Sequence, residues 1–221
     1  MTMTPPTSRY RLILCTERRR PDVVEAIMRF RKLILVDQRG WLLNVVGDIE
    51  RDQFDTESTV HGAILQSEQI LSCFRLVRTD RPYLAKEIFG HLAHFRPYPQ
   101  SYRVWEISRL AIDPSARPFE ISACTYAAIF QFAISRGATS LVAFAEVAKE
   151  RLVRSLGITT DLIGRPAQIG FDRFNQPMVC VAGELPLAMQ SGPRFERLMK
   201  HFDNLEIEDE DSLLGLARIS A

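Results

Sequence analysis

The order of strand-like and helix-like segments constrains this chain more than any other feature of its sequence. Residues 59–66 and 70–79 are both strand-like, and the short polar stretch between them predicts a hairpin. Later strand-like segments are separated by helix-like segments, which predicts a mixed sheet with helices on both faces. We therefore expect an α/β fold, a three-layer αβα sandwich. The remaining expected strands cover 9–15, 103–113, 140–145, 160–172 and 178–185, and the expected helices cover 21–40, 82–92, 119–136 and 147–156.

Length and charge exclude several classes of protein. The chain has 221 residues, a length that favours one domain, 1–221. Its formal net charge of +1, from 28 Lys and Arg against 27 Asp and Glu, argues against a protein that binds nucleic acid by neutralising phosphates. No apolar stretch approaches the roughly 20 residues of a membrane span, and the N-terminus lacks the apolar core of a secretory signal. We expect a cytoplasmic protein with no membrane or nucleic-acid partner.

The two ends and the cysteines carry further expectations. Residues 1–20 are expected to be a flexible N-terminal part that begins with a loose arm, and residues 203–221 a solvated acidic tail. The four cysteines show no CxxC spacing, so we expect buried free thiols in a reducing compartment.

Four ionisable side chains interrupt rows of residues that are otherwise apolar. Arg31 falls in the apolar stripe of the first helix, and Arg75 in an apolar row of the second hairpin strand. Glu106 and Arg109 interrupt the strand that follows. A buried charge costs several kcal/mol unless it is paired, so such groups pair with one another or face a polar ligand. For Arg31 alone, a side chain that extends outward to solvent is an equal alternative.

Glu106 and Arg109 are three residues apart, so a regular strand places them on opposite faces of a sheet. They share a site only if the strand bulges between them, and bulges are common beside active sites. Asp52 and Asp55 in the acidic loop add a carboxylate pair, which together with the arginines suits a zwitterionic or cationic ligand. The alternative is a structural ion-pair network that closes one end of the sheet.

Several familiar chemistries lack their motifs in this sequence. None of GxGxxG, GxxxxGK[ST] and GxSxG occurs, which argues against nucleotide-phosphate binding and serine hydrolysis. His91 and His94 have no further Cys or His nearby, so they are expected on a helix surface and no metal site is predicted.

Several segments, in order along the chain, carry a family resemblance. They are the helix ending in Gly40-Trp41, the loop GDIERDQFD, the segment CFRLVRTDRPYLAKEIF and the strand VWEISRLAID. From about residue 29 to 185 the chain resembles the acyl-homoserine-lactone synthases, the LuxI-type autoinducer synthase family. It departs from the family pattern at Leu35, where a phenylalanine is usual, and at Ser72, where a glycine is common.

The resemblance implies the fold of the GCN5-related N-acyltransferases, with a splayed central sheet. It also implies a reaction in which a fatty acyl thioester acylates the amine of S-adenosylmethionine, followed by lactonisation and release of methylthioadenosine. S-adenosylmethionine is then a substrate, and no cofactor is expected. Glu106 is the candidate base, acting through a water, and Trp41 either stacks on the ligand or packs in the core. The implied catalytic residues are Glu106, Arg109, Asp52 and Asp55, and the implied contacts to S-adenosylmethionine are Arg31, Trp41, Asp52, Asp55, Arg75, Phe89 and Arg109.

The acyl donor has its own implied residues. Acetyltransferases of this fold hold coenzyme A on a glycine-containing turn, but the corresponding stretch ARPFEISA has no glycine, which favours an acyl carrier protein over acyl-coenzyme A. Ala143 and Ala145 stand where members that make 3-oxo products often have a threonine, which favours an unsubstituted acyl chain. The expected acyl pocket is Phe119, Ile129, Leu141, Ala143, Phe144 and Ala145, and the expected carrier-docking residues are Lys149, Arg151 and Arg154. A solvated basic helix explains the last three nearly as well.

Two other functions remain open from the sequence. One is a coenzyme A-dependent N-acyltransferase of the same fold that acts on a small amine. The other is a non-catalytic binding module whose buried ions form a structural network.

Overall fold

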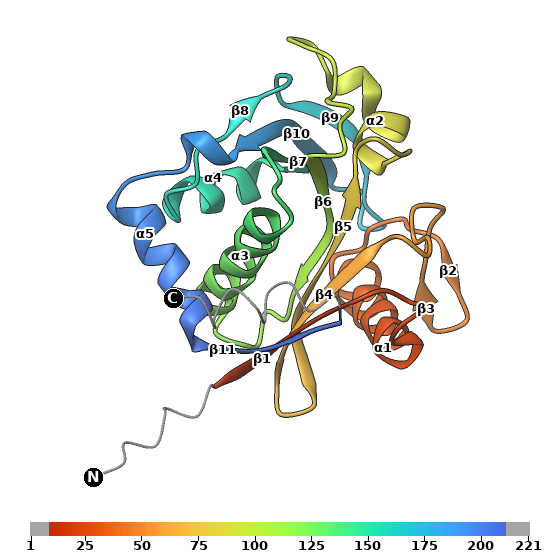
Figure 1. Ribbon diagram of the computed structural model, residues 1–221. Helices are drawn as coiled ribbons and strands as arrows, with labels where there is room; N and C mark the ends of the chain where they lie inside the picture. The colour runs from red at the N-terminus through yellow and green to blue at the C-terminus, as the bar shows by residue number, and fades with distance from the viewer. Residues whose placement is uncertain (1–8, 211–221) are drawn as a thin grey trace.

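The computed structural model describes residues 9–210 and contains one large mixed sheet flanked by helices (Figure 1). Nine strands form this sheet in the order β11-β1-β4-β5-β6-β7-β10-β8, and β9 pairs with β10. The strands are β1 (Tyr10–Cys15), β2 (Val45–Val46), β3 (Ile49–Glu50), β4 (Val60–Gln66), β5 (Gln69–Arg78), β6 (Val104–Ile112), β7 (Ser140–Glu146), β8 (Asp161–Leu162), β9 (Ala167–Phe171), β10 (Pro177–Pro186) and β11 (Leu205–Asp209). The α-helices are α1 (Pro21–Arg31), α2 (Leu84–Phe89), α3 (Pro118–Ser135), α4 (Val147–Ser155) and α5 (Pro193–Met199).

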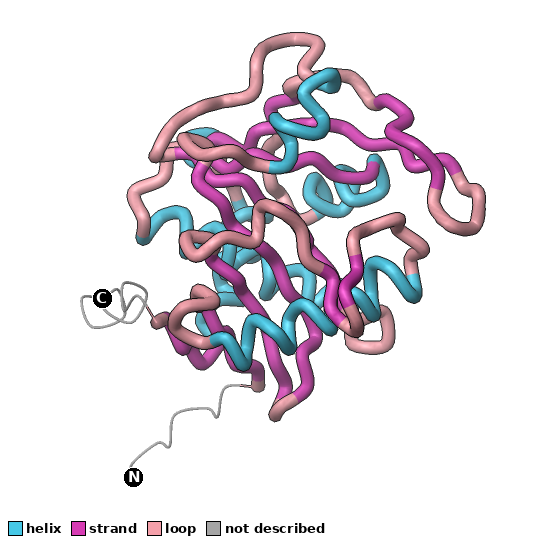
Figure 2. The backbone as a smooth tube through the Cα atoms, turned by 90° about the vertical axis from the view of Figure 1, so that its right-hand side faces the viewer, coloured by secondary structure: helices cyan, strands magenta, loops and turns pink. Residues whose placement is uncertain are grey.

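Helices cover both faces of the sheet, so the predicted three-layer sandwich is confirmed. In Figure 2 the sheet is seen with α1 and α2 in front of it and α3 behind. The alternation along β1 explains this, because Leu12 and Leu14 join the core under α3 whereas Ile13 and Cys15 join the core under α1. The hairpin of β4 and β5 and the helix-separated strands after it also lie as the sequence predicted.

The centre of the sheet opens between β6 and β7. These parallel strands pair only from Val104 to Ile107, opposite Ser140 to Ala143. Beyond that point β6 continues in its pairing with β5 and β7 continues in its pairing with β10, so the two strands separate. The splay implied by the family resemblance is therefore present, and it leaves the facing halves of β6 and β7 without a neighbour on one side.

The first helix ends earlier than the sequence predicted. α1 runs to Arg31 and continues as a π-helix, Lys32–Gln38, in which the Arg39 amide donates to the Ile34 carbonyl. Gly40 follows with φ +73°, and a Cβ there would lie 2.7 Å from the ring of Phe174 in the β9–β10 hairpin. The tip of that hairpin therefore packs directly on the backbone that leads to the next residue, Trp41.

Segments near both ends of the described chain are strands of the sheet. β1 confirms the strand expected at 9–15, and it is an inner strand between β4 and β11 although it falls within the part, 1–20, predicted to be flexible. β11, which falls within the predicted acidic tail, pairs in parallel with β1, and its Leu205 is buried. The reason is that Leu205 and Ile207 alternate with acidic residues, so one side of the strand packs on the core while the other keeps its charges outward. Residues 1–8 and 211–221 lie outside the described residues.

Two simpler predictions concern thiols and membranes. Cys15, Cys73, Cys124 and Cys180 are all free and buried, as the spacing predicted. Within residues 9–210, no helix has the length and apolarity needed to cross a membrane.

Candidate active site

A bulge in β6 brings Glu106 and Arg109 to the same cavity. Opposite β5, Ser108 pairs with Arg75 and Ala111 pairs with Cys73, so two residues of β6 face one residue of β5. Arg109 is one of these two and has φ +52°, a conformation rare for a side chain of its size. The bulge that the spacing of Glu106 and Arg109 required is therefore confirmed, and both side chains line one cavity.

The cavity lies at the splay of the sheet. Its walls come from the unpaired halves of β6 and β7, with α3, α4 and β10 closing it. Trp41 contributes from a loop and Leu84 from the start of α2. Most of the lining is apolar, but several ionisable groups face it as well. These are Arg39, Glu106, Arg109, Glu146, Lys149 and Glu150.

Glu106 is the buried acid of this cavity. Its carboxylate accepts hydrogen bonds from the backbone amides of Ala85, at 2.6 Å, and Leu84, at 3.2 Å, where α2 begins. Burial raises the pKa of Glu106 to about 7, although these two hydrogen bonds and the nearby Arg75 and Arg109 oppose the shift. A carboxyl with this pKa can exchange a proton at neutral pH.

Beside Glu106 lies a buried network of three guanidinium groups and three carboxylates. Arg31 binds Asp55 through two hydrogen bonds of 2.8 and 2.9 Å. Arg75 binds Asp52 at 2.5 and 3.1 Å, and Arg109 also binds Asp52, at 2.5 Å. Glu50 completes the network by accepting from both Arg31 and Arg109. The charges balance within this network, which explains how six ionisable side chains remain inside the fold.

The network changes the roles expected of several residues. Arg31, Asp55 and Arg75 were expected to contact the ligand, but they are fully buried and do not line the cavity. Arg31 does not extend to solvent either. Arg109 lines the cavity, and Asp52, which binds Arg109, does not; with side-chain exposures of 7% and 9%, these two residues form the accessible edge of the network. The buried members therefore position this edge through ion pairs. Arg75 binds Asp52 directly, and Arg31 binds Glu50, which in turn binds Arg109.

Sequence reasoning missed Glu50 and His61. Glu50 lies in the short strand β3, inside a stretch that its polar composition predicted to be a loop. His61 on β4 is buried, and neither ring nitrogen has a hydrogen-bond partner among the described residues. Burial lowers the pKa of His61 to about 4, and the charges of Arg31 and Arg75 act in the same direction while Asp55 opposes them. The alternation of β4 could have indicated His61, but no local signal marks Glu50.

The two aromatic residues expected at the ligand differ in position. Trp41 lines the cavity, and the guanidinium of Arg39 lies 5.9 Å from its ring centre. Phe89 does not line the cavity. It stacks on Phe144, with ring centres 4.0 Å apart, and Phe144 forms part of the cavity wall.

Only three of the six residues predicted for the acyl pocket line this cavity. Ala143, Phe144 and Ala145 line the cavity as expected. Phe119 is 61% exposed at the start of α3, because it occupies the outward side of that helix turn. Ile129 and Leu141 are packed in the core and are not part of the cavity lining.

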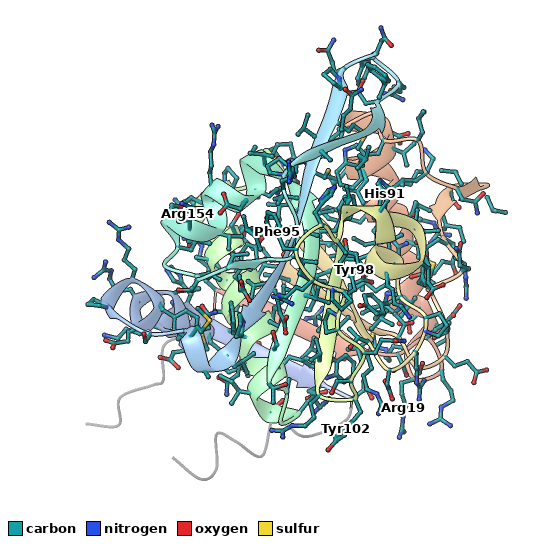
Figure 3. All side chains as sticks on the ribbon, turned by 90° about the horizontal axis from the view of Figure 1, so that it is seen from above. Arg19, His91, Phe95, Tyr98, Tyr102 and Arg154 are labelled. Carbon is teal, nitrogen blue, oxygen red and sulfur yellow. The ribbon has the colours of Figure 1, made fainter. Side chains whose placement is uncertain are left out.

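The predicted docking residues do not share one surface. Lys149 lines the cavity, where burial and the charge of Arg39 lower its pKa to about 8 against the effect of Glu146. Arg151 and Arg154 are exposed and lie with Arg194 in a shallow surface depression. Figure 3 shows Arg154 extending outward at the edge of the molecule. Successive residues of α4 point in different directions, which separates Lys149 from the two arginines.

Comparison with known proteins decides the family. The model of the autoinducer synthase family matches residues 15–182. The chain belongs to this family. Its relatives include the acyl-homoserine-lactone synthase of Ralstonia nicotianae, which is 36% identical over 162 residues, or 69% of this chain and 79% of the relative. The chain is thus an acyl-homoserine-lactone synthase, an acyltransferase of quorum sensing, as the resemblance implied.

Solved structures agree with this assignment. The crystal structure of TofI in a ternary complex with an inhibitor and MTA is 29% identical, with a TM-score of 0.69 over 84% of this chain and 96% of TofI. BjaI with MTA, named as a CoA-dependent acyl-homoserine lactone synthase, has a TM-score of 0.79 over 95% of this chain and 99% of its own. At 22% identity, BjaI supports the fold alone.

Proposed function

We propose that this synthase uses Glu106 as the base that activates the amine of S-adenosylmethionine. The observation that carries the proposal is a buried carboxyl with a pKa of about 7 on the wall of the cavity, beside Arg109. The substrate amine is protonated at neutral pH and must lose a proton before it attacks a thioester. A base with a pKa near the working pH suits this step, either directly or through one water.

The rest of the ligand has matching groups in the cavity and in the network beside it. The carboxylate of S-adenosylmethionine suits the guanidinium of Arg109, and its cationic part suits Asp52 at the accessible edge of the network. Trp41 offers a ring face to the adenine or the sulfonium. Arg31, Asp55, Arg75 and Glu50 hold these groups in place rather than contacting the ligand.

The proposed reaction has two bond-forming steps. Glu106 takes one proton from the substrate ammonium group and releases it to solvent. The amine nitrogen then attacks the thioester carbonyl, an amide bond forms, the carbon–sulfur bond of the thioester breaks, and the second proton from the nitrogen goes to the leaving thiolate. The substrate carboxylate next attacks the carbon beside the sulfonium, which closes the lactone and releases methylthioadenosine. This second step needs no proton transfer, so holding the chain folded is the main requirement. Such positioning is worth roughly 7–11 kcal/mol at best.

The substitution Glu106→Gln tests this role. It keeps a hydrogen-bond acceptor for the α2 amides but removes the base, so methylthioadenosine release at saturating substrates should fall by roughly 10²–10⁴. A circular dichroism melt shows whether the variant is folded. An unchanged release rate from folded Glu106→Gln removes Glu106 from the base role.

For the donor, we propose an acyl carrier protein rather than coenzyme A. At the start of α3, Pro118 has no amide proton to offer a pyrophosphate, and Asp113 already accepts from the amide and hydroxyl of Ser115. Glu120 in the first turn adds a repelling charge. The exposed arginines of α4 suit the acidic helix of a carrier protein. Matched acyl-carrier and acyl-coenzyme A donors separate the two, and a strong preference for coenzyme A overturns the proposal.

We also propose that residues 1–221 act as one catalytic domain in the cytoplasm. Strands near both ends of the chain, β1 and β11, pair in the same sheet. Four free thiols suit a reducing compartment. Fractionation of the native host tests whether the protein is in the cytoplasm. Removal of β11 tests the single domain, because a strand that belongs to the same folding unit should be needed for the chain to fold.

A further inference from the structure

The side chain of Tyr126 brings a hydroxyl group to the wall of the cavity. Tyr126 lies in the middle of α3, is 6% exposed and lines the cavity. Its hydroxyl makes no hydrogen bond to any residue in 9–210. Other buried tyrosines do: Tyr83 donates to the Pro99 carbonyl at 2.6 Å, and Tyr10 donates to Glu120 at 3.1 Å. Burial raises the pKa of the Tyr126 hydroxyl further above its usual value, so the group stays a protonated donor.

The surroundings of Tyr126 are apolar. Ile107, Ala143, Val153 and Leu185 line the same cavity and also lie in or against the core under α3. An unsubstituted alkyl chain in this space displaces water and leaves the hydroxyl with no acceptor, which is unfavourable. An acyl chain that carries an oxygen at the right carbon restores the hydrogen bond. A site that holds a buried donor for one substrate group discriminates against the analogue that lacks the group.

We propose that Tyr126 selects acyl donors with an oxygen substituent, a hydroxyl or a carbonyl, over unsubstituted donors of the same length. The proposal rests on the proposed function of the cavity. It departs from the expectation of an unsubstituted chain, which considered only Ala143 and Ala145 on β7. The donor group comes from α3 instead, where the sequence predicted apolar residues alone.

The test compares wild type, Tyr126→Phe and a control, Tyr102→Phe. Tyr102 is 67% exposed and lies at the rim of the molecule in Figure 3, so its hydroxyl does not reach the cavity. Each enzyme receives donors of equal chain length that are unsubstituted, 3-oxo, 3-hydroxy or hydroxylated at the far end. Wild type and Tyr102→Phe should prefer one oxygenated donor by about tenfold or more in kcat/KM, and Tyr126→Phe should lose this preference. Methylthioadenosine release is the readout.

A binding measurement gives an independent result. The oxygenated product should raise the melting temperature of wild type more than the unsubstituted product does, and the difference should vanish in Tyr126→Phe. Equal donor ratios in wild type and Tyr126→Phe, or a wild type that prefers the unsubstituted donor, overturn the proposal. A wild type that releases no methylthioadenosine with any donor removes the proposed function, and this proposal with it.

Discussion

Glu106 and Arg109 lie three residues apart on β6, yet both line the same cavity because the strand bulges between them. The bulge turns Arg109 toward Glu50 and Asp52, while Glu106 stays under the first turn of α2. A cationic group and a carboxyl that titrates near neutrality thus stand next to each other without forming a direct ion pair. Because Arg109 forms no ion pair with Glu106, the Glu106 carboxylate remains able to accept a proton.

The rate should depend on the ionisation of Glu106. Because a base must be ionised to act, kcat/KM should rise as the pH increases through about 7. In Glu106→Gln the remaining activity should lose this limb. A pH–rate profile of methylthioadenosine release checks both statements, and a wild-type profile that is flat between pH 6 and 8 contradicts them.

The buried network should contribute strongly to stability. Arg31→Met leaves Asp55 and Glu50 buried without their main cation, so the free energy of unfolding should fall by about 3–5 kcal/mol. Arg29→Met, on the same helix, breaks an exposed pair with Glu25 and serves as the control. Chemical denaturation measures both. Equal midpoints for the two variants would show that the network contributes nothing special.

His61 should make stability depend on pH below neutrality. Its pKa of about 4 in the folded state lies below the usual value of 6.5, so the unfolded chain binds the proton more readily. The contribution of His61 to the free energy of unfolding is then fully present above about pH 6.5. It is lost as the pH falls toward 4, by about 3 kcal/mol in total. His61→Gln should lose this part of the slope. Unfolding free energies at several pH values test the difference in slope, whatever the absolute stability of the variant.

The exposed arginines of α4 should govern affinity for a carrier protein. Arg151→Glu or Arg154→Glu should raise KM for acyl-carrier donors severalfold, since rim charges steer association, but leave KM for acyl-coenzyme A unchanged. Arg19→Glu is a matched control, because Arg19 and Arg154 lie on different sides of the molecule (Figure 3). Equal effects on both donor types would assign the arginines a general role.

Ala143 should limit the length of the acyl chain. Ala143→Leu adds volume to the cavity wall, so the products should shift to shorter chains. Phe119→Ser, at the exposed start of α3, should leave the product distribution unchanged. Mass spectrometry of the lactones compares the two. If Phe119→Ser changed the chain length of the products and Ala143→Leu did not, Phe119 would belong to the acyl pocket, as the sequence predicted, and Ala143 would not.

Much of the fold could be predicted from local patterns. Segment boundaries follow from hydrophobic periodicity, from Pro21 at the start of a helix, and from the short turn that joins β4 and β5 in a hairpin. The bulge at Arg109 followed from the three-residue spacing together with the hypothesis that Glu106 and Arg109 share a site. These predictions succeed because each rests on neighbours in sequence, whose relative positions the backbone geometry already limits.

Other features could not be predicted in this way. β11 was expected to be a solvated tail because of its acidic residues, and the strand that it pairs with, β1, lies at the other end of the chain. That error arose because the decisive contact joins distant segments. Lys149 and Arg154 were grouped as one surface, although the turn of their own helix separates them.

By itself, the sequence determined the family, the strand and helix order and the presence of charged residues in apolar rows. Only the tertiary structure decided which of those charges reach the cavity, since Arg31 and Arg75 pair with Asp55 inside the fold while Glu106 and Arg109 line the cavity. The physical reason is that a buried ion must find its partner in space. Glu50 takes its place in the network from contacts with distant residues, Arg31 and Arg109, which the order of residues does not contain.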